Sequence, residues 1–381
     1  MRSVTSGSRR KPCSVSTATS TEVARPTLAR ILTGNLRHNA RRVREEAPRS
    51  RIMACVKADA YGHGITTASE ALNDIVDGFA VACISEALAL RDAGIKKPVL
   101  MLEGPQSPDE VPEAAHKDLT LCVNEWHQLE WLEKAGLSAP LACWLKIDTG
   151  MHRLGFSPQR TAEALQRLER KAKNPELVLC THFSSADLPK DNGVEAQVRA
   201  FDEVAATTAY AHSLANSAAI LTIPESHRHW VRPGYMLYGG SPLADAAAAT
   251  LNLKPAMEFV AEVISVRDVS VGERVGYRGR WEARRPSRIA TVAAGYGDGY
   301  PRHAPDGTPV FINGKVAPLA GRVSMDMITV DVTEHPDIAV GAKAVLWGGE
   351  PTVDEVATAA DTIGYEILAG MPKRVPRVVE D

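Results

Sequence analysis

Short apolar runs that alternate with amphipathic segments constrain this chain more than any other feature of its sequence. Eight such runs lie at residues 52–56, 79–82, 99–102, 120–123, 141–147, 177–181, 213–215 and 230–231. The segments between them have helical character, most clearly at residues 85–93, 124–135, 158–172 and 195–206. Strands that alternate with helices are typical of a parallel sheet, and eight units in about 220 residues predict a (β/α)8 TIM-like barrel. An open doubly wound sheet is the alternative that this pattern leaves.

The pattern changes near Leu251. Short runs at residues 260–266, 288–293, 309–312, 315–318, 327–332 and 344–346 are separated by turns rich in Gly, Pro and Asp, which is typical of an all-β region. A helix near residues 353–360 and a last strand follow. We therefore expect an α/β barrel at residues 25–250 and a mainly-β C-terminal domain at residues 251–381. Residues 1–24 are rich in Ser, Thr and Arg without an apolar core, so we expect a disordered N-terminal extension, with a targeting signal as the alternative.

The composition excludes several classes of function. The 381 residues carry a formal net charge of −2, whereas a nucleic-acid-binding protein needs a basic surplus or stripe. No segment approaches the ~18 uncharged apolar residues of a membrane helix. The six cysteines show no metal-ligand spacing, and five of them lie in apolar, strand-like runs where a thiol acts as a small hydrophobe. We expect a cytoplasmic protein in a reducing compartment, with no nucleic-acid or membrane partner and no metal.

Polar residues gather at the C-terminal ends of the runs, where barrels of this type carry their active sites. Lys57 directly follows the first run, and a partly buried lysine there suits Schiff-base formation or proton abstraction. A lysine that reaches from a strand end to solvent is the ordinary alternative. The fifth run contains Lys146 and is followed by Arg153, whose guanidinium can hold a carboxylate by two parallel hydrogen bonds. The sixth run is followed by His182, which taken alone indicates a structural histidine.

The seventh and eighth runs end in small and polar residues. Loops after these two strands frequently hold a phosphate group in barrel enzymes. Ser217 opens a short helix and offers a hydroxyl and an amide, and Gly234 allows the backbone to approach a ligand closely. Together with Lys57, these residues suggest pyridoxal 5'-phosphate (PLP), whose aldehyde bonds a lysine. Arg232 lies beside the phosphate loop and is the candidate partner of the pyridine nitrogen.

These residues also carry a resemblance to a known family. The segment Val-Lys-Ala-Asp-Ala-Tyr-Gly-His-Gly at residues 56–64 resembles the PLP-attachment signature of the alanine racemases, which are fold-type III PLP enzymes. The resemblance continues, in order, at residues 146–155, 181–183, 216–219, 232–239, 275–279, 295–302, 321–327 and 364–368. It implies an enzyme that interconverts L-alanine and D-alanine by a two-base mechanism through a PLP external aldimine. Such an enzyme either supplies D-alanine for peptidoglycan or serves alanine catabolism.

The resemblance implies a role for individual residues. Lys57 matches the lysine that forms the Schiff base with PLP and acts as the base toward D-alanine, and Tyr277 matches the base for the L-isomer. Arg153 matches a residue near the substrate carboxylate, and Tyr296 and Met325 match residues of the substrate pocket. The cofactor-binding set that the resemblance implies consists of Lys57, Tyr61, His182, Ser217, Arg232, Gly234, Tyr235 and Tyr365.

The resemblance has three further implications. Lys146 matches a lysine that is carbamylated in many family members, which turns a cation into an anion that positions Arg153. In the family, Tyr277, Tyr296 and Met325 come from the second subunit, so a homodimer with shared active sites is implied. Tyr235 departs from the family, which usually has isoleucine there. Only its backbone amide is expected to contact the phosphate, so the function should survive this change; a bulkier ring that crowds the phosphate or turns toward the interface is the alternative.

Two other functions suit a barrel that binds PLP. A fold-related decarboxylase acting on diamino acids would carry a glycine-rich phosphate loop and would lack the motifs around Arg153 and Tyr277. A non-catalytic PLP-binding barrel would end after the barrel, whereas this chain continues for about 130 residues beyond residue 250.

Overall fold

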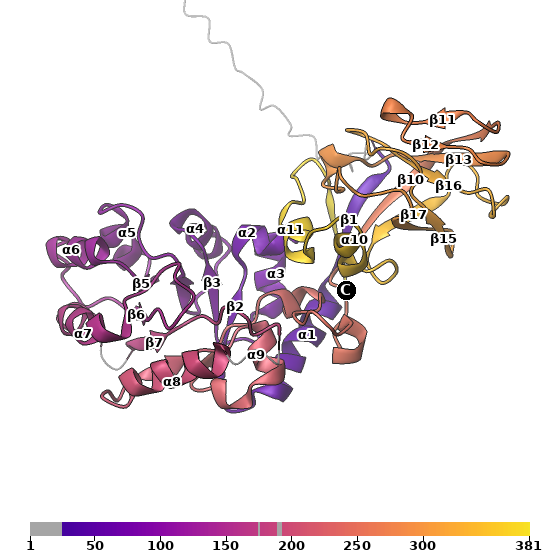
Figure 1. Ribbon diagram of the computed structural model, residues 1–381. Coiled ribbons are helices and arrows are strands. Elements are labelled where there is room, and N and C mark those ends of the chain that lie inside the picture. Colours follow the sequence, from indigo (N-terminus) through magenta and orange to yellow (C-terminus); the bar gives the residue numbers. More distant parts are fainter. Residues whose placement is uncertain (1–24, 174–175, 189–192) are drawn as a thin grey trace, which may run out of the picture.

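Eight parallel strands form a closed barrel, as the alternating pattern predicts (Figure 1). The computed structural model describes residues 25–173, 176–188 and 193–381; the extension predicted at residues 1–24 lies outside the described residues. The barrel strands are β2 (Arg51–Cys55), β3 (Gly78–Val81), β4 (Val99–Met101), β5 (Thr120–Val123), β6 (Cys143–Lys146), β7 (Val178–Cys180), β8 (Ala211–Ser213) and β9 (Trp230–Val231). Since β9 pairs with β2, the sheet has no open edge and the doubly wound alternative is wrong.

Helices cover the outside of the barrel (Figure 1). They are α1 (Thr33–Glu46), α3 (Ile65–Leu72), α4 (Ile84–Asp92), α5 (Glu110–His116), α6 (Trp126–Lys134), α7 (Thr161–Glu169), α8 (Gly193–Ala205) and α9 (Ser217–Thr222). Their apolar residues recur at helical spacing; α7, for example, buries Thr161, Ala164, Leu165 and Leu168 on one face. Burial of this face against the strands, rather than helix propensity alone, stabilises such short helices.

Side chains fill the interior of the barrel. The buried cluster consists of Met53, Cys55, Ala80, Leu100, Cys122, Trp144, Val178, Cys180 and Trp230. The rings of Trp144 and Trp230 lie 5.8 Å apart, and the Arg51 guanidinium lies 4.2 Å from the Trp230 ring centre. The interior is therefore a packed core that closes the barrel from the side of the strand N-termini, which leaves the opposite end for a ligand.

The C-terminal region is mainly β-structure, as its closely spaced turns predict. Its main strands are β10 (Met257–Val269), β13 (Ser287–Val292), β14 (Pro309–Ile312), β15 (Lys315–Pro318), β16 (Ile328–Asp331), β17 (Lys343–Trp347) and β18 (Arg377–Glu380), with a small ribbon of β11 (Arg274–Val275) and β12 (Trp281–Glu282). The long strand β10 pairs with β1 (Thr27–Leu32), β13 and β17 and forms the centre of this sheet. Two helices follow β17, α10 (Val353–Ala359) and α11 (Gly364–Ala369).

The first strand of the described chain lies in the C-terminal sheet and not in the barrel. Strand β1 (Thr27–Leu32) is antiparallel to β10 and parallel to β18, and in Figure 1 it lies among the strands of the C-terminal domain. We expected residues 25–250 to form the barrel, whereas the structure places residues 27–32 in the C-terminal sheet. The physical reason is its single buried face: Thr27, Ala29 and Ile31 are buried and alternate with partly exposed residues, whereas barrel strands are buried on both faces.

Helix α11 brings the C-terminal domain to the barrel. It packs against α2 (Lys57–Tyr61), the segment that follows the first barrel strand. Two sequence-distant parts of the chain therefore meet at the open end of the barrel. Within residues 25–173, 176–188 and 193–381, the structure contains no helix long and apolar enough to cross a membrane.

Candidate active site

A cavity of about 560 Å³ lies at the C-terminal ends of the barrel strands. It brings together ten residues that the sequence singles out: Lys57, Tyr61, Lys146, Arg153, His182, Ser217, Arg232, Gly234, Tyr235 and Tyr365. The lining also includes residues that sequence reasoning missed: Cys55, Ala58, Leu102, Glu103, Cys122, Leu154, Cys180, Thr181, Asn216 and Ala369. The three cysteines could have been found from the sequence, because they lie near the C-terminal ends of strands, where alternate side chains point into the barrel.

The cavity is cationic. Lys57, Lys146, Arg153 and Arg232 all line it, and Glu103 is the carboxylate among the lining residues of the described chain. Like charges at close quarters in a partly desolvated site are unfavourable unless an anion joins them. The lining therefore favours a ligand with several negative charges, such as a phosphate together with a carboxylate.

Lys57 stands at the start of a strained turn. The four residues after it, Ala58–Tyr61, have φ angles of 53°, 53°, 54° and 51°, so the segment is a left-handed turn of non-glycine residues. Such a conformation costs about 1–2 kcal/mol per residue and persists only where the surroundings hold it. The Glu86 carboxylate accepts hydrogen bonds from the amides of Ala58 at 2.7 Å and Ala82 at 2.8 Å. This turn fixes Lys57 at the strand end and directs Tyr61 back to the cavity.

The loop after β6 carries Arg153 to the cavity wall. Oδ1 of Asp148 accepts hydrogen bonds from the amides of Gly150, Met151 and His152 at 3.0–3.1 Å, which fixes the backbone of the loop. Asp148 itself does not line the cavity. Lys146 lies below the loop on β6, and burial lowers its pKa, with the charges of Arg232 and Arg153 acting in the same direction. At a given pH, a larger fraction of Lys146 is therefore present as the neutral amine than for an exposed lysine.

Arg232 is buried, and its partners are neutral. Nη1 donates to the Ser213 carbonyl at 2.9 Å and to its hydroxyl at 2.6 Å, and Nη2 donates to the carbonyls of Thr181 at 2.5 Å and Leu214 at 3.3 Å. The guanidinium is thus fixed in orientation while its charge is not cancelled by a carboxylate. It is suited to face the neutral ring nitrogen of a pyridine.

His182 lies beside these cations as a neutral imidazole. Burial, followed by the charges of Arg232, Lys146, Arg153 and Lys57, lowers the pKa of His182 to about 3. Around neutral pH its ring therefore has one nitrogen that donates and one that accepts a hydrogen bond.

One end of the cavity has the features of a phosphate site. The Ser217 hydroxyl accepts a hydrogen bond from the Gly234 amide at 2.8 Å, which joins the loops after β8 and β9. A Cβ on Gly234 would lie 2.7 Å from the Tyr61 hydroxyl, so only glycine leaves this space free. Hydroxyls and amides that surround a space without a side chain fit a phosphate. With Lys57 as an amine and Arg232 as a fixed cation, the residues present fit PLP.

The ring of Tyr235 neither crowds this end of the cavity nor points into solvent. It is 1 % exposed, stacks on the ring of Tyr365 at 3.9 Å, and its hydroxyl donates to Oδ1 of Asp354 at 2.5 Å. The ring is therefore buried within its own chain, and its hydroxyl is directed away from the cavity to Asp354. The ring turns toward Asp354 and Gly364 of the C-terminal domain of its own chain, and Gly240, after the last barrel strand, also leaves room for it.

Three predicted site residues lie outside the cavity. Tyr277 is 65 % exposed, Met325 is 52 % exposed and Tyr296 is 38 % exposed, and none of them is among the lining residues of the described chain. Their loops are neighbours on the C-terminal domain. The amides of Tyr296 and Gly297 donate to the carbonyls of Ser324 at 3.0 Å and Met325 at 2.8 Å. Large exposed apolar side chains grouped in this way are typical of a contact surface.

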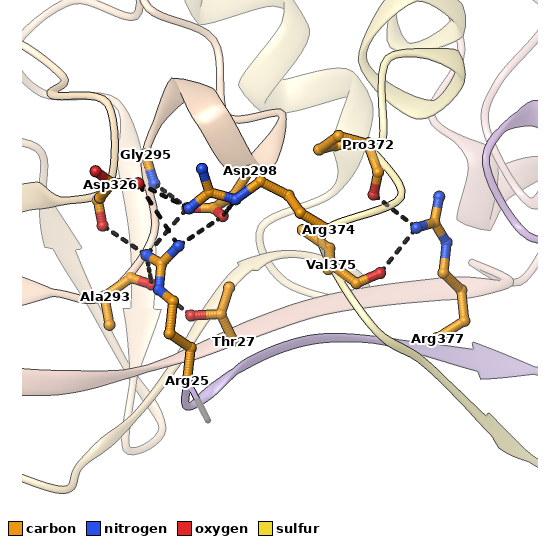
Figure 2. A network of polar contacts seen from close by, with 10 residues as sticks. All are labelled: Arg25, Thr27, Ala293, Gly295, Asp298, Asp326, Pro372, Arg374, Val375 and Arg377. Atoms are coloured by element: carbon orange, nitrogen blue, oxygen red, sulfur yellow. Dashed lines mark hydrogen bonds and ion pairs between the residues drawn. The ribbon is translucent and has the colours of Figure 1, made fainter. Parts of the chain in front are cut away.

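A buried acid holds the loops of Tyr296 and Met325 in place (Figure 2). The Asp298 side chain is 2 % exposed and forms ion pairs with Arg25 at 2.9 Å and Arg374 at 3.0 Å. Its second oxygen accepts from the Gly295 amide at 2.9 Å, and Arg25 also donates to the Asp326 carbonyl at 2.8 Å. Residues from both ends of the described chain thus fix these two loops.

We expect Asp298→Asn to lower the free energy of unfolding by about 1–3 kcal/mol, because two guanidiniums lose a buried, hydrogen-bonded charge partner. Urea unfolding followed by circular dichroism measures this change. Asp337→Asn is the matched control, since Asp337 pairs with Lys315 on the surface and its loss should leave the stability nearly unchanged. Equal effects of the two substitutions would contradict the role given to Asp298.

The buried His63 gives the stability a defined dependence on pH. Its Nδ1 donates to the Tyr61 carbonyl at 2.8 Å and its Nε2 has no partner within the described residues, so burial lowers the pKa of His63 to about 4. Below the unfolded pKa near 6.5, protons bind the unfolded chain and not the folded one, so stability falls as the pH falls toward 4.

Between about pH 7.5 and about pH 5, His63 should reduce the free energy of unfolding by about 2 kcal/mol. In His63→Gln, the fall in the free energy of unfolding between these two pH values should be smaller by about 2 kcal/mol, whatever the stability of the variant at neutral pH. Urea titrations at the two pH values measure the difference. The exposed His116 provides the control, and a His63→Gln variant with an unchanged loss would show that another group carries the effect.

Comparison with known proteins assigns both parts of the chain to one family. The family model described as alanine racemase, N-terminal domain, matches residues 31–242, and the model described as alanine racemase, C-terminal domain, matches residues 256–379. An alanine racemase of Stutzerimonas stutzeri is 48 % identical over 353 residues, which cover 93 % of this chain and 99 % of the relative. The biosynthetic and catabolic alanine racemases of Pseudomonas aeruginosa are 47 % and 46 % identical, each with the same coverage.

Solved structures agree with this assignment. The biosynthetic alanine racemase of Pseudomonas aeruginosa superimposes with a TM-score of 0.91 at 46 % identity and covers 94 % of this chain and 100 % of its own. An alanine racemase of Bartonella henselae, described with covalently bound pyridoxal phosphate, has a TM-score of 0.84 at 29 % identity and covers 93 % of this chain and 99 % of its own.

Proposed function

Since the chain belongs to the alanine racemase family, an enzyme family of the PLP-dependent racemase type, we propose that it interconverts L-alanine and D-alanine. The observation that carries the proposal is the cationic cavity with Lys57 on its wall, next to a phosphate-type pocket. The proposal covers both supply of D-alanine for peptidoglycan and alanine catabolism, because biosynthetic and catabolic relatives match at 47 % and 46 % identity. The C-terminal domain, which carries Tyr277, counts against a non-catalytic PLP-binding barrel.

The residues of the cavity suit PLP as the cofactor. Lys57 would hold its aldehyde carbon, Ser217, Gly234, Tyr61, Tyr235 and Tyr365 would surround its phosphate, and Arg232 would face its ring nitrogen. When bound, PLP supplies an aldehyde that takes up the amino group of alanine and a ring that makes the Cα proton more acidic. A relative described with covalently bound pyridoxal phosphate supports this choice.

Racemisation requires a proton acceptor on one face of the substrate and a proton donor on the other. We propose that Lys57 Nζ exchanges the Cα proton on one face and Tyr277 Oη on the opposite face. A tyrosine with an ordinary pKa near 10 needs assistance to accept a proton. The neutral ring of His182 can accept a hydrogen bond from the tyrosine hydroxyl, and the fixed charge of Arg232 lies nearby.

The remaining contacts would select and orient alanine. Arg153 carries a guanidinium at the cavity wall that would hold the substrate carboxylate. The side chains of Tyr296 and Met325 would limit the space to a small substituent at Cα. We also propose a cytoplasmic location, supported by five free cysteines among the described residues, because thiols of this kind persist in reducing compartments.

We propose that two copies of the chain assemble and share their active sites. Tyr277 is 65 % exposed and does not line the cavity of its own chain, although the reaction needs a group on the face opposite Lys57. A symmetric dimer places the same surface of each subunit against the other. In such a dimer, the loops of Tyr277, Tyr296 and Met325 would complete the partner's cavity.

Co-expression of two inactive variants tests both the catalytic pair and the sharing. Lys57→Ala and Tyr277→Phe should each reduce racemisation of L-alanine at least ~100-fold, because each removes a proton-transfer group. A hybrid dimer of the two variants has one site with both groups intact, so the isolated hybrid should have about half of the parental activity and a random mixture of the co-expressed chains about a quarter. The decay of the optical rotation of L-alanine measures the rate.

The matched control combines Lys57→Ala with Arg153→Ala. Both substitutions lie in the barrel cavity of one chain, so each site of the hybrid lacks one essential group and no activity should return. An inactive hybrid of Lys57→Ala with Tyr277→Phe would exclude shared sites. Loss of optical rotation that persists after borohydride treatment would instead exclude the PLP-dependent reaction itself.

We propose that CO2 modifies Lys146. The lowered pKa of Lys146 makes the neutral amine accessible, and addition of CO2 releases one proton and leaves an anionic carbamate among Arg153 and Arg232. With ¹³C-labelled bicarbonate, the enzyme should show a carbamate carbon signal that Lys146→Arg abolishes. Lys57→Arg should keep this signal; a signal that survives Lys146→Arg would assign the modification to another amine.

A further inference from the structure

The ring of Tyr235 occupies a slot that both domains shape. A Cβ on Gly240 would lie 2.0 Å from Tyr235 Cζ, and a Cβ on Gly364 would lie 1.7 Å from the Tyr235 hydroxyl oxygen. Any larger residue at either position would displace the ring, because such contacts lie far inside van der Waals distance. Gly240 belongs to the segment after the last barrel strand, and Gly364 begins α11. The two glycines thus leave room for one aromatic side chain.

A carboxylate of the C-terminal domain fixes the end of this ring. Oδ1 of Asp354 accepts from the Tyr235 hydroxyl at 2.5 Å, and Oδ2 accepts from the Ser241 amide at 2.9 Å. Asp354 lies in the first turn of α10, so both of its oxygens join this helix to the segment after the barrel. A hydrogen bond to a charged acceptor is about twice as strong as a neutral one.

The Tyr235 ring also contacts Tyr365, a residue that lines the cavity. The rings of Tyr235 and Tyr365 are stacked, with centroids 3.9 Å apart and planes at 17°. Tyr365 lines the cavity from α11 and tilts against Tyr61, whose ring centre lies 6.2 Å away. A flat stack of two rings limits both the position and the rotation of the outer ring. The orientation of Tyr365 therefore depends on a ring that is itself held by Asp354.

We propose that Tyr235 is a positioning residue for the cofactor phosphate, and that it acts through Tyr365. The Asp354 carboxylate and the two glycines fix Tyr235, and the stack then holds the Tyr365 hydroxyl at the phosphate end of the cavity. This inference rests on the proposed function, because the ligand that Tyr365 contacts is the phosphate of PLP. It assigns to the Tyr235 side chain a role that its backbone amide does not supply.

A double-mutant cycle tests the connection between the two tyrosines. The holoenzyme and the variants Tyr235→Phe, Tyr365→Phe and the double variant are brought to equilibrium by dialysis against graded PLP concentrations. Tyr365→Phe should raise the dissociation constant of PLP about tenfold and Tyr235→Phe about three- to fivefold, the size expected for a lost and a weakened hydrogen bond. The double variant should bind PLP as Tyr365→Phe does, because the Tyr235 hydroxyl acts only through Tyr365.

Two controls separate this role from a general effect on stability. Tyr300→Phe removes a buried tyrosine hydroxyl that has no partner within the described residues, and it should leave the dissociation constant of PLP unchanged. Replacing PLP by pyridoxal in the dialysis removes the phosphate, so the parent and Tyr235→Phe should then bind equally.

Each outcome is decisive. The inference is overturned if the two substitutions raise the dissociation constant of PLP by factors that multiply in the double variant. It is also overturned if Tyr235→Phe weakens the binding of PLP and of pyridoxal equally. Both outcomes leave the proposed function intact. An unchanged PLP affinity in Tyr365→Phe would also overturn the inference. A parent enzyme that retains no PLP would overturn the proposed function itself.

A substitution on the barrel side gives an independent test. Gly240→Ala should weaken PLP binding about as much as Tyr235→Phe, because its Cβ would push the ring off Asp354. In a Tyr235→Ile background the ring atoms that this Cβ would meet are gone, so Gly240→Ala should have no further effect. Equal weakening in both backgrounds would contradict the proposed role of the Tyr235 ring.

Discussion

The organisation of the site depends on Arg232, a buried cation that is held by neutral groups. Arg232 has four oxygen acceptors within the described residues, and all of them are carbonyls or a hydroxyl. Lys57, Lys146 and Arg153 line the same cavity, in which Glu103 contributes the carboxylate of the described lining. Positive charge that is oriented but not neutralised attracts anions and lowers the pKa of any base nearby. The preference for a phosphate and a carboxylate follows from this constraint, and burial together with this charge keeps His182 neutral.

Holding these groups in place requires both domains. The left-handed turn after Lys57 would relax without external support, and part of that support comes from the C-terminus. Arg377 on β18 donates to the Gly62 carbonyl at 3.1 Å. Figure 2 shows that its guanidinium also donates to the carbonyls of Pro372 and Val375, at 2.7 and 2.8 Å. Since β1 lies in the C-terminal sheet and α1 lies against the barrel, the chain passes between the domains after β1 and again before β10. Cavity geometry and the packing of the two domains are therefore coupled.

The apolar runs predicted the barrel because a strand that is buried on both faces consists of consecutive apolar residues. The strand ends then located the cavity, since the C-terminal ends of parallel strands meet at one edge. Strand β1 could not be assigned in the same way: its partly exposed positions include Leu28 and Leu32, so the residue types do not reveal its single buried face or its pairing with β10. The direction of the Tyr235 ring was equally hidden, because it depends on Gly240, Gly364 and Asp354, which become its neighbours only in the folded chain.

The proposed division of the catalytic groups between two surfaces follows from the chemistry of the proposed racemisation. The strand ends of a barrel contact one face of a flat ligand. In this chain, the cavity wall at the strand ends carries Lys57 and its neighbours. The opposite face must be covered by something that is not part of the same barrel. Tyr296 and Met325 stand exposed on two loops that are joined by backbone hydrogen bonds and by the Arg25–Asp298–Arg374 cluster, so their arrangement is fixed within the single chain. Tyr277 is exposed on the segment that follows β11. Preorganised loops of this kind bind with little loss of conformational entropy. A second copy of the chain is then the simplest source of the second face, because symmetry supplies two complete cavities from one set of contacts.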